Sequence, residues 1–215
     1  MRNTNIHIIW DLDGTLVNSS PEIVKHLERA VEKANISPSL KEKEFRVGPP
    51  LDQMILEAYP KISPEKIEEI TIYYRTSYDH SDFAKTLPFE GIEGVLKSIA
   101  QTAIVNHIVT NKPNFPTQRI LEKLGWISHF KTVKTPYVKG ETLIKKKDLM
   151  KEILDEFSLN PQNVISIGDT ATDAVAAKAN TIRTVGVLWG TGTTEELCPV
   201  CDELVNQPNQ IISLL

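Results

Sequence analysis

The most informative segment of this chain lies near the N-terminus and reads Ile8-Ile9-Trp10-Asp11-Leu12-Asp13-Gly14-Thr15-Leu16. A short apolar run over residues 6–10 predicts a buried strand, and it ends abruptly in two carboxylates spaced by one residue. Because alternate residues of a strand point the same way, Asp11 and Asp13 are expected on one side. Neighbouring carboxylates repel each other and lose solvation, so a bound cation or a reaction is the usual reason to keep them there.

Length and charge limit the kind of protein this is. The 215 residues suit one core domain with a sizeable insertion, or two small domains. A formal net charge of −4 without a long basic cluster argues against nucleic acid, and no apolar stretch reaches membrane-spanning length. The N-terminus lacks a secretory apolar segment, so a cytoplasmic location is expected. Cys198 and Cys201 form a single CxxC, which is interpreted as a turn rather than a zinc site.

The chain divides by its periodicity into a helical insertion and an alternating remainder. Apolar residues at helical spacing follow Pro21, Leu51 and Pro64, so residues 18–85 are expected to form a helical domain. Residues 1–17 and 86–215 are expected to form the core domain, in which strands and helices alternate. Strands are expected over 6–10, 103–109, 129–133, 164–167, 184–188 and 204–205, and helices over 91–101, 115–124, 148–157, 173–179 and 209–214. This alternation predicts an α/β fold, a Rossmann-like parallel sheet with helices on both faces.

Polar side chains follow several of these strands, where ligands gather in such a fold. They could converge on one pocket with a lysine run that comes just before the helix at Asp148. The clusters are Asp11, Asp13 and Thr15; Thr110, Asn111 and Lys112; Gly168, Asp169 and Asp173; and Lys145, Lys146 and Lys147.

These residue types suit phosphoryl transfer. Asp11, Asp13 and Asp169 offer the hard oxygen ligands that Mg²⁺ prefers, and Asp173 lies one helical turn beyond Asp169. A lysine and the Thr110 hydroxyl suit a phosphoryl oxygen. An aspartate can attack phosphorus to form an aspartyl phosphate. A neighbouring aspartate can protonate the leaving oxygen and then deprotonate the hydrolytic water.

The sequence resembles the haloacid dehalogenase superfamily of phosphatases over nearly its whole length. Residues 11–16 match the first motif of that family, Thr110-Asn111 the second and residues 168–173 the fourth. The resemblance implies that Asp11 is the nucleophile and Asp13 the general acid and base.

The same resemblance implies a Mg²⁺ ion held by Asp11, the backbone carbonyl of Asp13, and Asp169. Asp173 would bind the metal or orient its water shell. Thr110 is expected to contact the transferring phosphoryl group, and Thr15 and Asn111 to bind substrate.

The third motif of the family, a lysine, falls within a run of three lysines in this chain. Relatives often carry Lys-Pro, whereas this chain has Lys145-Lys146-Lys147-Asp148. Counting back from Gly168-Asp169 favours Lys146, and Lys145 and Lys147 stay possible.

The insertion resembles the helical cap of the family. Residues 46–51 are similar to the specificity loop of phosphoglycolate phosphatase-like members, and Arg46 is expected to reach a substrate carboxylate or second phosphate. Dehalogenases of the superfamily lack the second aspartate, so Asp13 favours phosphoryl transfer.

The resulting hypothesis is a Mg²⁺-dependent phosphoric monoester hydrolase acting on a small phosphorylated metabolite such as phosphoglycolate, as a monomer or homodimer. The alternatives are a nucleotide phosphatase or pyrophosphatase, a sugar phosphomutase on the same core, and a non-catalytic binding protein.

Overall fold

The computed structural model describes residues 5–139 and 142–215, which divide into two compact units. One unit is Asn18–Leu87, and the other combines Met1–Val17 with Pro88–Leu215. The chain passes between them through two short strands, β2 (Val17–Asn18) and β3 (Leu87–Pro88), which pair with each other. The larger unit is called the core unit below, and Asn18–Leu87 the helical unit.

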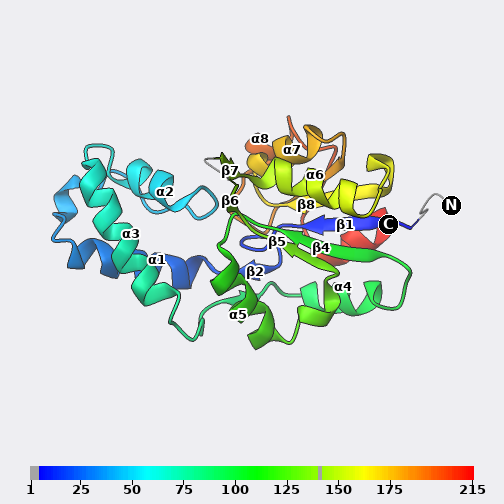
Figure 1. Ribbon diagram of the computed structural model, residues 1–215, viewed down its shortest axis with the longest axis horizontal. Coiled ribbons are helices and arrows are strands. Elements are labelled where there is room, and N and C mark those ends of the chain that lie inside the picture. Colours follow the sequence, from blue (N-terminus) through cyan, green and yellow to red (C-terminus); the bar gives the residue numbers. More distant parts are fainter. Residues whose placement is uncertain (1–4, 140–141) are drawn as a thin grey trace. The chain divides into compact units, whose positions relative to one another are not determined.

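The core unit is built on a six-stranded parallel sheet with the order β10-β9-β8-β1-β4-β5 (Figure 1). The first strand, β1, lies in the middle, with His7 opposite Val105 of β4 on one side and Val164 of β8 on the other. All of its residues are buried, as expected for a strand with both faces covered. The strands are β1 (His7–Trp10), β4 (Val105–Val109), β5 (Thr132–Lys134), β8 (Val164–Gly168), β9 (Arg183–Val187) and β10 (Glu203–Val205).

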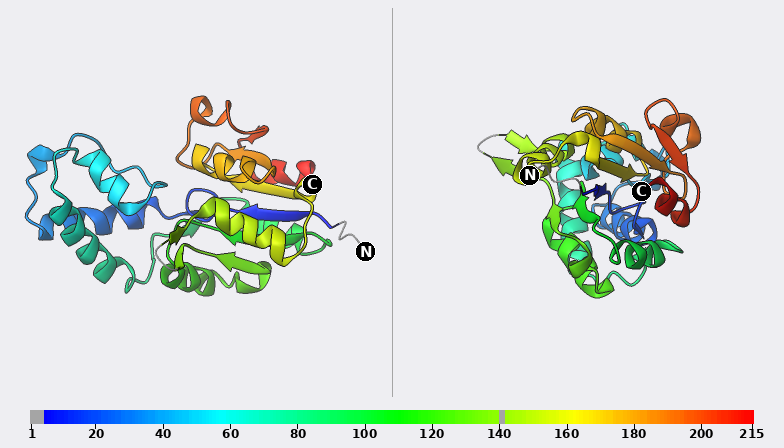
Figure 2. Two further views of the ribbon diagram at one scale, coloured as in Figure 1. Left: turned by 45° about the horizontal axis from the view of Figure 1, so that its top comes forward. Right: turned by 90° about the vertical axis from the view of Figure 1, so that its right-hand side faces the viewer.

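Helices cover both faces of this sheet. In the core unit, α6 (Lys146–Glu156) and α7 (Ala171–Lys178) lie on one face, and α4 (Ile92–Ile99) and α5 (Asn114–Leu124) on the other (Figures 1 and 2). The predicted α/β fold with a parallel sheet is therefore confirmed. Short elements complete the unit: η2 (Ile127–His129), η3 (Pro161–Asn163), α8 (Thr194–Leu197) and η4 (Pro208–Leu214).

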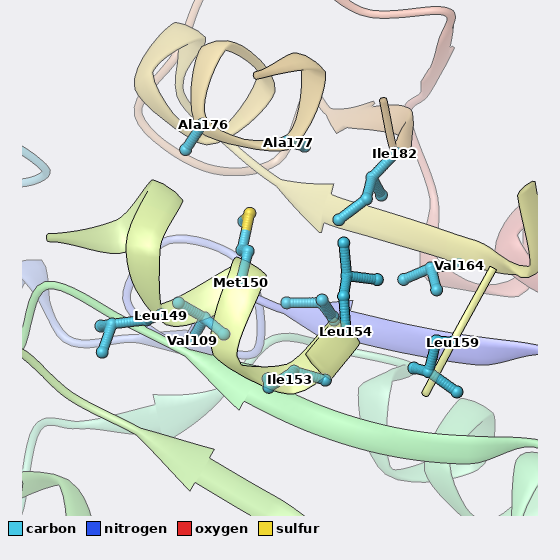
Figure 3. Close-up of a cluster of buried hydrophobic side chains, with 11 residues drawn as sticks. Val109, Leu149, Met150, Ile153, Leu154, Leu159, Val164, Ala176, Ala177 and Ile182 are labelled. Carbon is cyan, nitrogen blue, oxygen red and sulfur yellow. The ribbon is translucent and has the colours of Figure 1, made fainter. Parts of the chain in front are cut away.

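A cluster of buried aliphatic side chains holds α6 and α7 against the sheet (Figure 3). Leu149 and Ile153, one helical turn apart on α6, are fully buried and belong to it with Val109 of β4. Burying each large side chain contributes roughly 1.5–3 kcal/mol. The packing fixes the position of α6, whose first residue is Lys146.

The structure differs from the sequence prediction between α5 and α6. Residues 129–133 were expected as a strand, but a 3-10 turn at Ile127–His129 precedes β5. An antiparallel hairpin of β6 (Tyr137–Lys139) and β7 (Thr142–Ile144) was not expected at all. Its residues are almost all exposed, so the hairpin lacks the apolar alternation that marks a half-buried strand.

The helical unit contains three α-helices and a short 3-10 turn. They are α1 (Ser20–Lys33), η1 (Pro38–Leu40), α2 (Leu51–Ala58) and α3 (Pro64–Tyr78). Helix α3 packs against both α1 and α2, and it begins where the Ser63 side chain accepts a hydrogen bond from the Lys66 amide. None of the helices in the described parts of either unit has the length and apolarity needed to cross a bilayer.

Candidate active site

The carboxyl end of β1 carries the two aspartates that open the site. The Asp11 amide donates to the Ile167 carbonyl of β8 at 2.9 Å, so the backbone follows the sheet up to the first carboxylate. The chain then turns at Gly14, which has a φ of +84°. A Cβ atom there would lie 2.1 Å from Oδ2 of Asp169, so both the conformation and the space require glycine.

Lys146 connects two of the acids. It begins α6, and its Nζ lies 2.6 Å from Oδ1 of Asp11 and 2.5 Å from Oδ1 of Asp173. All three side chains are buried or nearly so. Of the three consecutive lysines, Lys146 is the one that the fold brings to Asp11, whereas Lys145 and Lys147 are exposed.

Burial and charge shift the protonation of this group. Burial, together with the nearby Asp173 and Asp169, raises the pKa of the Asp11 carboxyl well above its usual range, although Lys146 opposes this. Burial alone would lower the pKa of Lys146, but the carboxylates of Asp11 and Asp173 raise it above its ordinary value. Lys146 is therefore a permanent ammonium group.

Asp169 follows β8 and is held on both oxygens. Its Oδ1 accepts from the Thr15 hydroxyl at 3.3 Å, and its Oδ2 accepts from the Thr191 amide and hydroxyl at 2.8 Å each. Burial and the neighbouring Asp173 raise the pKa of Asp169 to about 6. A Cβ at Gly190 would lie 2.3 Å from the Asp169 Cβ, so the loop after β9 packs directly on this aspartate.

The two carboxylate oxygens of Asp173 have different partners. It stands in the first turn of α7, where its Oδ2 accepts from the amide and hydroxyl of Thr170 at 3.0 and 2.7 Å. Its other oxygen contacts Lys146. A capping role alone therefore does not account for Asp173.

The acids form one cluster of oxygen ligands. Asp11, Asp169 and Asp173 each offer a carboxylate oxygen, and these atoms lie within 4.8 Å of one another. Lys146 compensates only part of their combined negative charge, so a divalent cation fits the donor set in both chemistry and charge. The Asp13 carboxylate is not in this group among the described residues.

The loop after β4 carries the other predicted polar residues. Thr110 is buried, and its Oγ1 accepts from the Lys112 amide at 3.1 Å. Asn111 is half-buried. The Lys112 ammonium donates to both carboxylate oxygens of Asp13, at 3.1 and 3.0 Å.

Sequence reasoning placed Lys112 among the clustered polar residues without giving it a role, and it missed Thr191. The position of Lys112 beside Thr110, after a strand, was a signal for Lys112. The glycine- and threonine-rich stretch 190–193, after another strand, was a signal for Thr191. Their partners could not be predicted, because Asp13 is 99 positions from Lys112 and Asp169 is 22 positions from Thr191.

The remaining residues singled out in the sequence are Arg46, Thr15 and the two cysteines. Arg46 belongs to the helical unit, where it is exposed in the segment between η1 and α2. Thr15 is fully buried, and its carbonyl accepts from the Trp189 indole at 3.0 Å. Cys198 is an exposed free thiol, and Cys201 is half-buried.

Comparisons with known proteins agree with this architecture. Residues 8–187 match the family model of haloacid dehalogenase-like hydrolases. A 5'-nucleotidase of Pseudomonas aeruginosa is 27% identical over 89% of this chain and 86% of its own. A phosphoglycolate phosphatase of Xylella fastidiosa is 26% identical over 94% of this chain and 89% of its own.

A solved structure shares the fold. A haloacid dehalogenase-like family hydrolase from Streptococcus pneumoniae superposes with a TM-score of 0.86, at 23% identity, over 98% of both chains. The family model, the two relatives and the fold of the solved structure all support the same family assignment. The chain therefore belongs to the haloacid dehalogenase-like hydrolase family and is a phosphatase of that family.

Proposed function

We propose that this phosphatase hydrolyses a small phosphomonoester through an aspartyl phosphate on Asp11, with Mg²⁺ as its cofactor. The observation that carries the proposal is the contact of Lys146 with Asp11 and Asp173 beside Asp169 at one edge of the sheet. A carboxylate at the end of a buried strand, backed by a fixed ammonium group, is suited to attack an anionic phosphoryl group.

In the first step, an Asp11 carboxylate oxygen attacks phosphorus and the bond to the leaving oxygen breaks. Asp13 gives its proton to that oxygen, so the product leaves as an alcohol. In the second step, Asp13 removes a proton from water, and the water oxygen attacks the same phosphorus. Inorganic phosphate leaves, and Asp11 returns as a carboxylate.

The remaining residues bind charge. Lys146 compensates the charge around Asp11, and the Thr110 hydroxyl donates a hydrogen bond to a phosphoryl oxygen. Asp11, Asp169 and the Asp13 carbonyl would hold Mg²⁺, with Asp173 orienting its water shell. When bound, the ion supplies positive charge against the transferring phosphoryl group.

Phosphoglycolate is the first candidate substrate, because a relative named phosphoglycolate phosphatase matches 94% of the chain. Arg46 is the proposed ligand of the substrate's carboxylate. Arg46→Ala should raise KM for phosphoglycolate at least tenfold and leave KM unchanged for an alkyl phosphate that lacks a carboxylate.

A nucleoside monophosphate is the second candidate, since another relative of similar coverage is named a 5'-nucleotidase. Phosphate release from phosphoglycolate, nucleoside monophosphates, pyrophosphate and hexose phosphates, compared at equal concentration with Mg²⁺, ranks these substrate classes. Isomerisation of a hexose phosphate without phosphate release would support a phosphomutase instead.

Two measurements test the proposed mechanism. Asp11→Asn should abolish phosphate release from 4-nitrophenyl phosphate while the protein stays folded by circular dichroism. EDTA should silence the wild-type enzyme and excess Mg²⁺ should restore it. Turnover by Asp11→Asn would contradict the proposed nucleophile. Turnover by the wild-type enzyme in EDTA would contradict the proposed cofactor.

A further inference from the structure

A second lysine–aspartate pair lies beside the acidic cluster. The Lys112 ammonium contacts both oxygens of Asp13, at 3.1 and 3.0 Å. The two side chains are 4% and 14% exposed, so the pair is largely shielded from water. Lys146 contacts Asp11 and Asp173, whereas Lys112 contacts Asp13. The two neighbouring aspartates are therefore paired with different lysines.

The backbone around Lys112 is held in place. Its amide donates to Thr110 Oγ1 at 3.1 Å, and the next carbonyl, that of Pro113, accepts from the Thr117 hydroxyl at 2.8 Å. The lysine stem therefore starts from a fixed point at the end of β4. One loop thus positions both Thr110 and the cation that holds Asp13.

Contact with both oxygens restricts how the Asp13 carboxylate rotates. Removing a lysine from water is costly, and the paired charge offsets that cost only when the geometry is good. A general acid must lie within hydrogen-bond reach of the leaving oxygen, and a displacement of about 1 Å can reduce the rate about 100-fold. The orientation of Asp13 is therefore a property on which proton transfer depends.

We propose that Lys112 is a positioning residue, which orients Asp13 for proton transfer to the leaving oxygen. This inference rests on the proposed function, in which Asp13 is the general acid. The proposed role predicts different effects of a Lys112 substitution on two kinds of substrate. An alkyl ester such as phosphoglycolate must be protonated as it leaves, whereas 4-nitrophenolate leaves without a proton.

The test compares kcat/KM of Lys112→Met on these two esters at one pH, because kcat/KM covers the steps up to the aspartyl phosphate. We expect a loss of about 100-fold on phosphoglycolate and less than about fivefold on 4-nitrophenyl phosphate. Asp13→Asn should show the same selectivity. Lys97→Met, which removes an exposed lysine beside Glu93, is the matched control and should match wild type on both esters.

The double variant Lys112→Met/Asp13→Asn removes both charges, so it keeps the test decisive if Lys112→Met alone does not fold. It should be no slower on phosphoglycolate than Asp13→Asn. Lys112→Arg should recover part of the lost activity on phosphoglycolate.

Equal losses of Lys112→Met on the two esters, or a double variant much slower than Asp13→Asn, would overturn the inference and leave a purely structural pair. A wild-type enzyme inactive on both esters, or an active Asp11→Asn, contradicts the proposed function instead. The two failures are thus distinguishable.

Discussion

The Nζ atom of Lys146 lies 2.6 Å from Oδ1 of Asp11, a residue 135 positions earlier in the chain. The lysine begins a helix and the aspartate directly follows the central strand, so packing of α6 on the sheet sets this distance. Repulsion between the aspartates at the end of β1 is therefore relieved in part by lysines, with Lys146 at Asp11 and Lys112 at Asp13.

Replacing Lys146 with Met should reduce kcat/KM at least 100-fold, because the charge beside the nucleophile is lost. It should also destabilise the metal-free protein by roughly 3–5 kcal/mol, since buried carboxylates lose their partner. Urea unfolding with EDTA and with Mg²⁺ measures this, and Mg²⁺ should recover part of the loss. Lys147→Met, at the exposed neighbouring position, should behave like wild type.

Substituting Gly14 with Ala should disrupt the metal site through Asp169. The new Cβ would lie 2.1 Å from the Asp169 carboxylate, at a φ of +84°. Mg²⁺ affinity, measured by titrating activity, should fall at least tenfold. Gly125→Ala is the control, because Gly125 has a φ of +68° but nothing within 4 Å of its Cβ. It should cost only about 1–2 kcal/mol of stability and leave Mg²⁺ affinity unchanged; similar Mg²⁺ affinities in the two variants would contradict the prediction.

Replacing Thr191 with Val should weaken metal binding without unfolding the protein. The change removes the hydroxyl donor to Asp169 Oδ2 but keeps the amide donor. Residues that orient metal ligands typically contribute 10- to 100-fold in affinity. The concentration of Mg²⁺ at half-maximal activity should rise accordingly, while kcat at saturating Mg²⁺ stays within about threefold. An unchanged Mg²⁺ requirement would show that the hydroxyl does not orient Asp169.

The buried histidine pair predicts a pH-dependent stability. His7 Nδ1 and His107 Nε2 lie 2.9 Å apart, and burial, with His7 and Lys131 nearby, lowers the pKa of His107 to about 4. Because the unfolded chain binds a proton near pH 6.5 and the folded one does not, this group stabilises the protein above that pH. The stabilisation is lost as the pH falls from about 6.5 to about 4, up to about 3 kcal/mol in all.

Urea unfolding of the metal-free protein across this range tests the prediction. The raised pKa of Asp169 acts in the opposite direction, adding stability that fades as the pH rises through about 6. The difference between wild type and His107→Phe therefore isolates the contribution of the histidine pair, since burial also lowers the pKa of His7. The variant should lose less stability toward acid, whereas His80→Gln, at an exposed position, should follow wild type. Parallel curves for wild type and His107→Phe would contradict the assignment.

Much of the fold could be predicted because strong local patterns mark it. The buried strand before Asp11 and the amphipathic helix before Phe157 lie within a residue or two of their predicted ranges. The β6–β7 hairpin was not predicted, because its side chains are mostly exposed and its sequence shows no alternation of apolar and polar residues. The 3-10 turn at residues 127–129 escaped because a short turn carries no periodic pattern of its own.

The polar residues that follow the central strands can be read from the sequence, because apolar runs that stop at carboxylates, hydroxyls and glycines are local signals. Which charged side chains contact one another depends on the three-dimensional fold. It brought Lys146, rather than its neighbours, to Asp11 and Asp173, and Lys112 to Asp13. These partners are 27 to 135 positions apart, so strand order and helix packing, which no local pattern specifies, set their contacts.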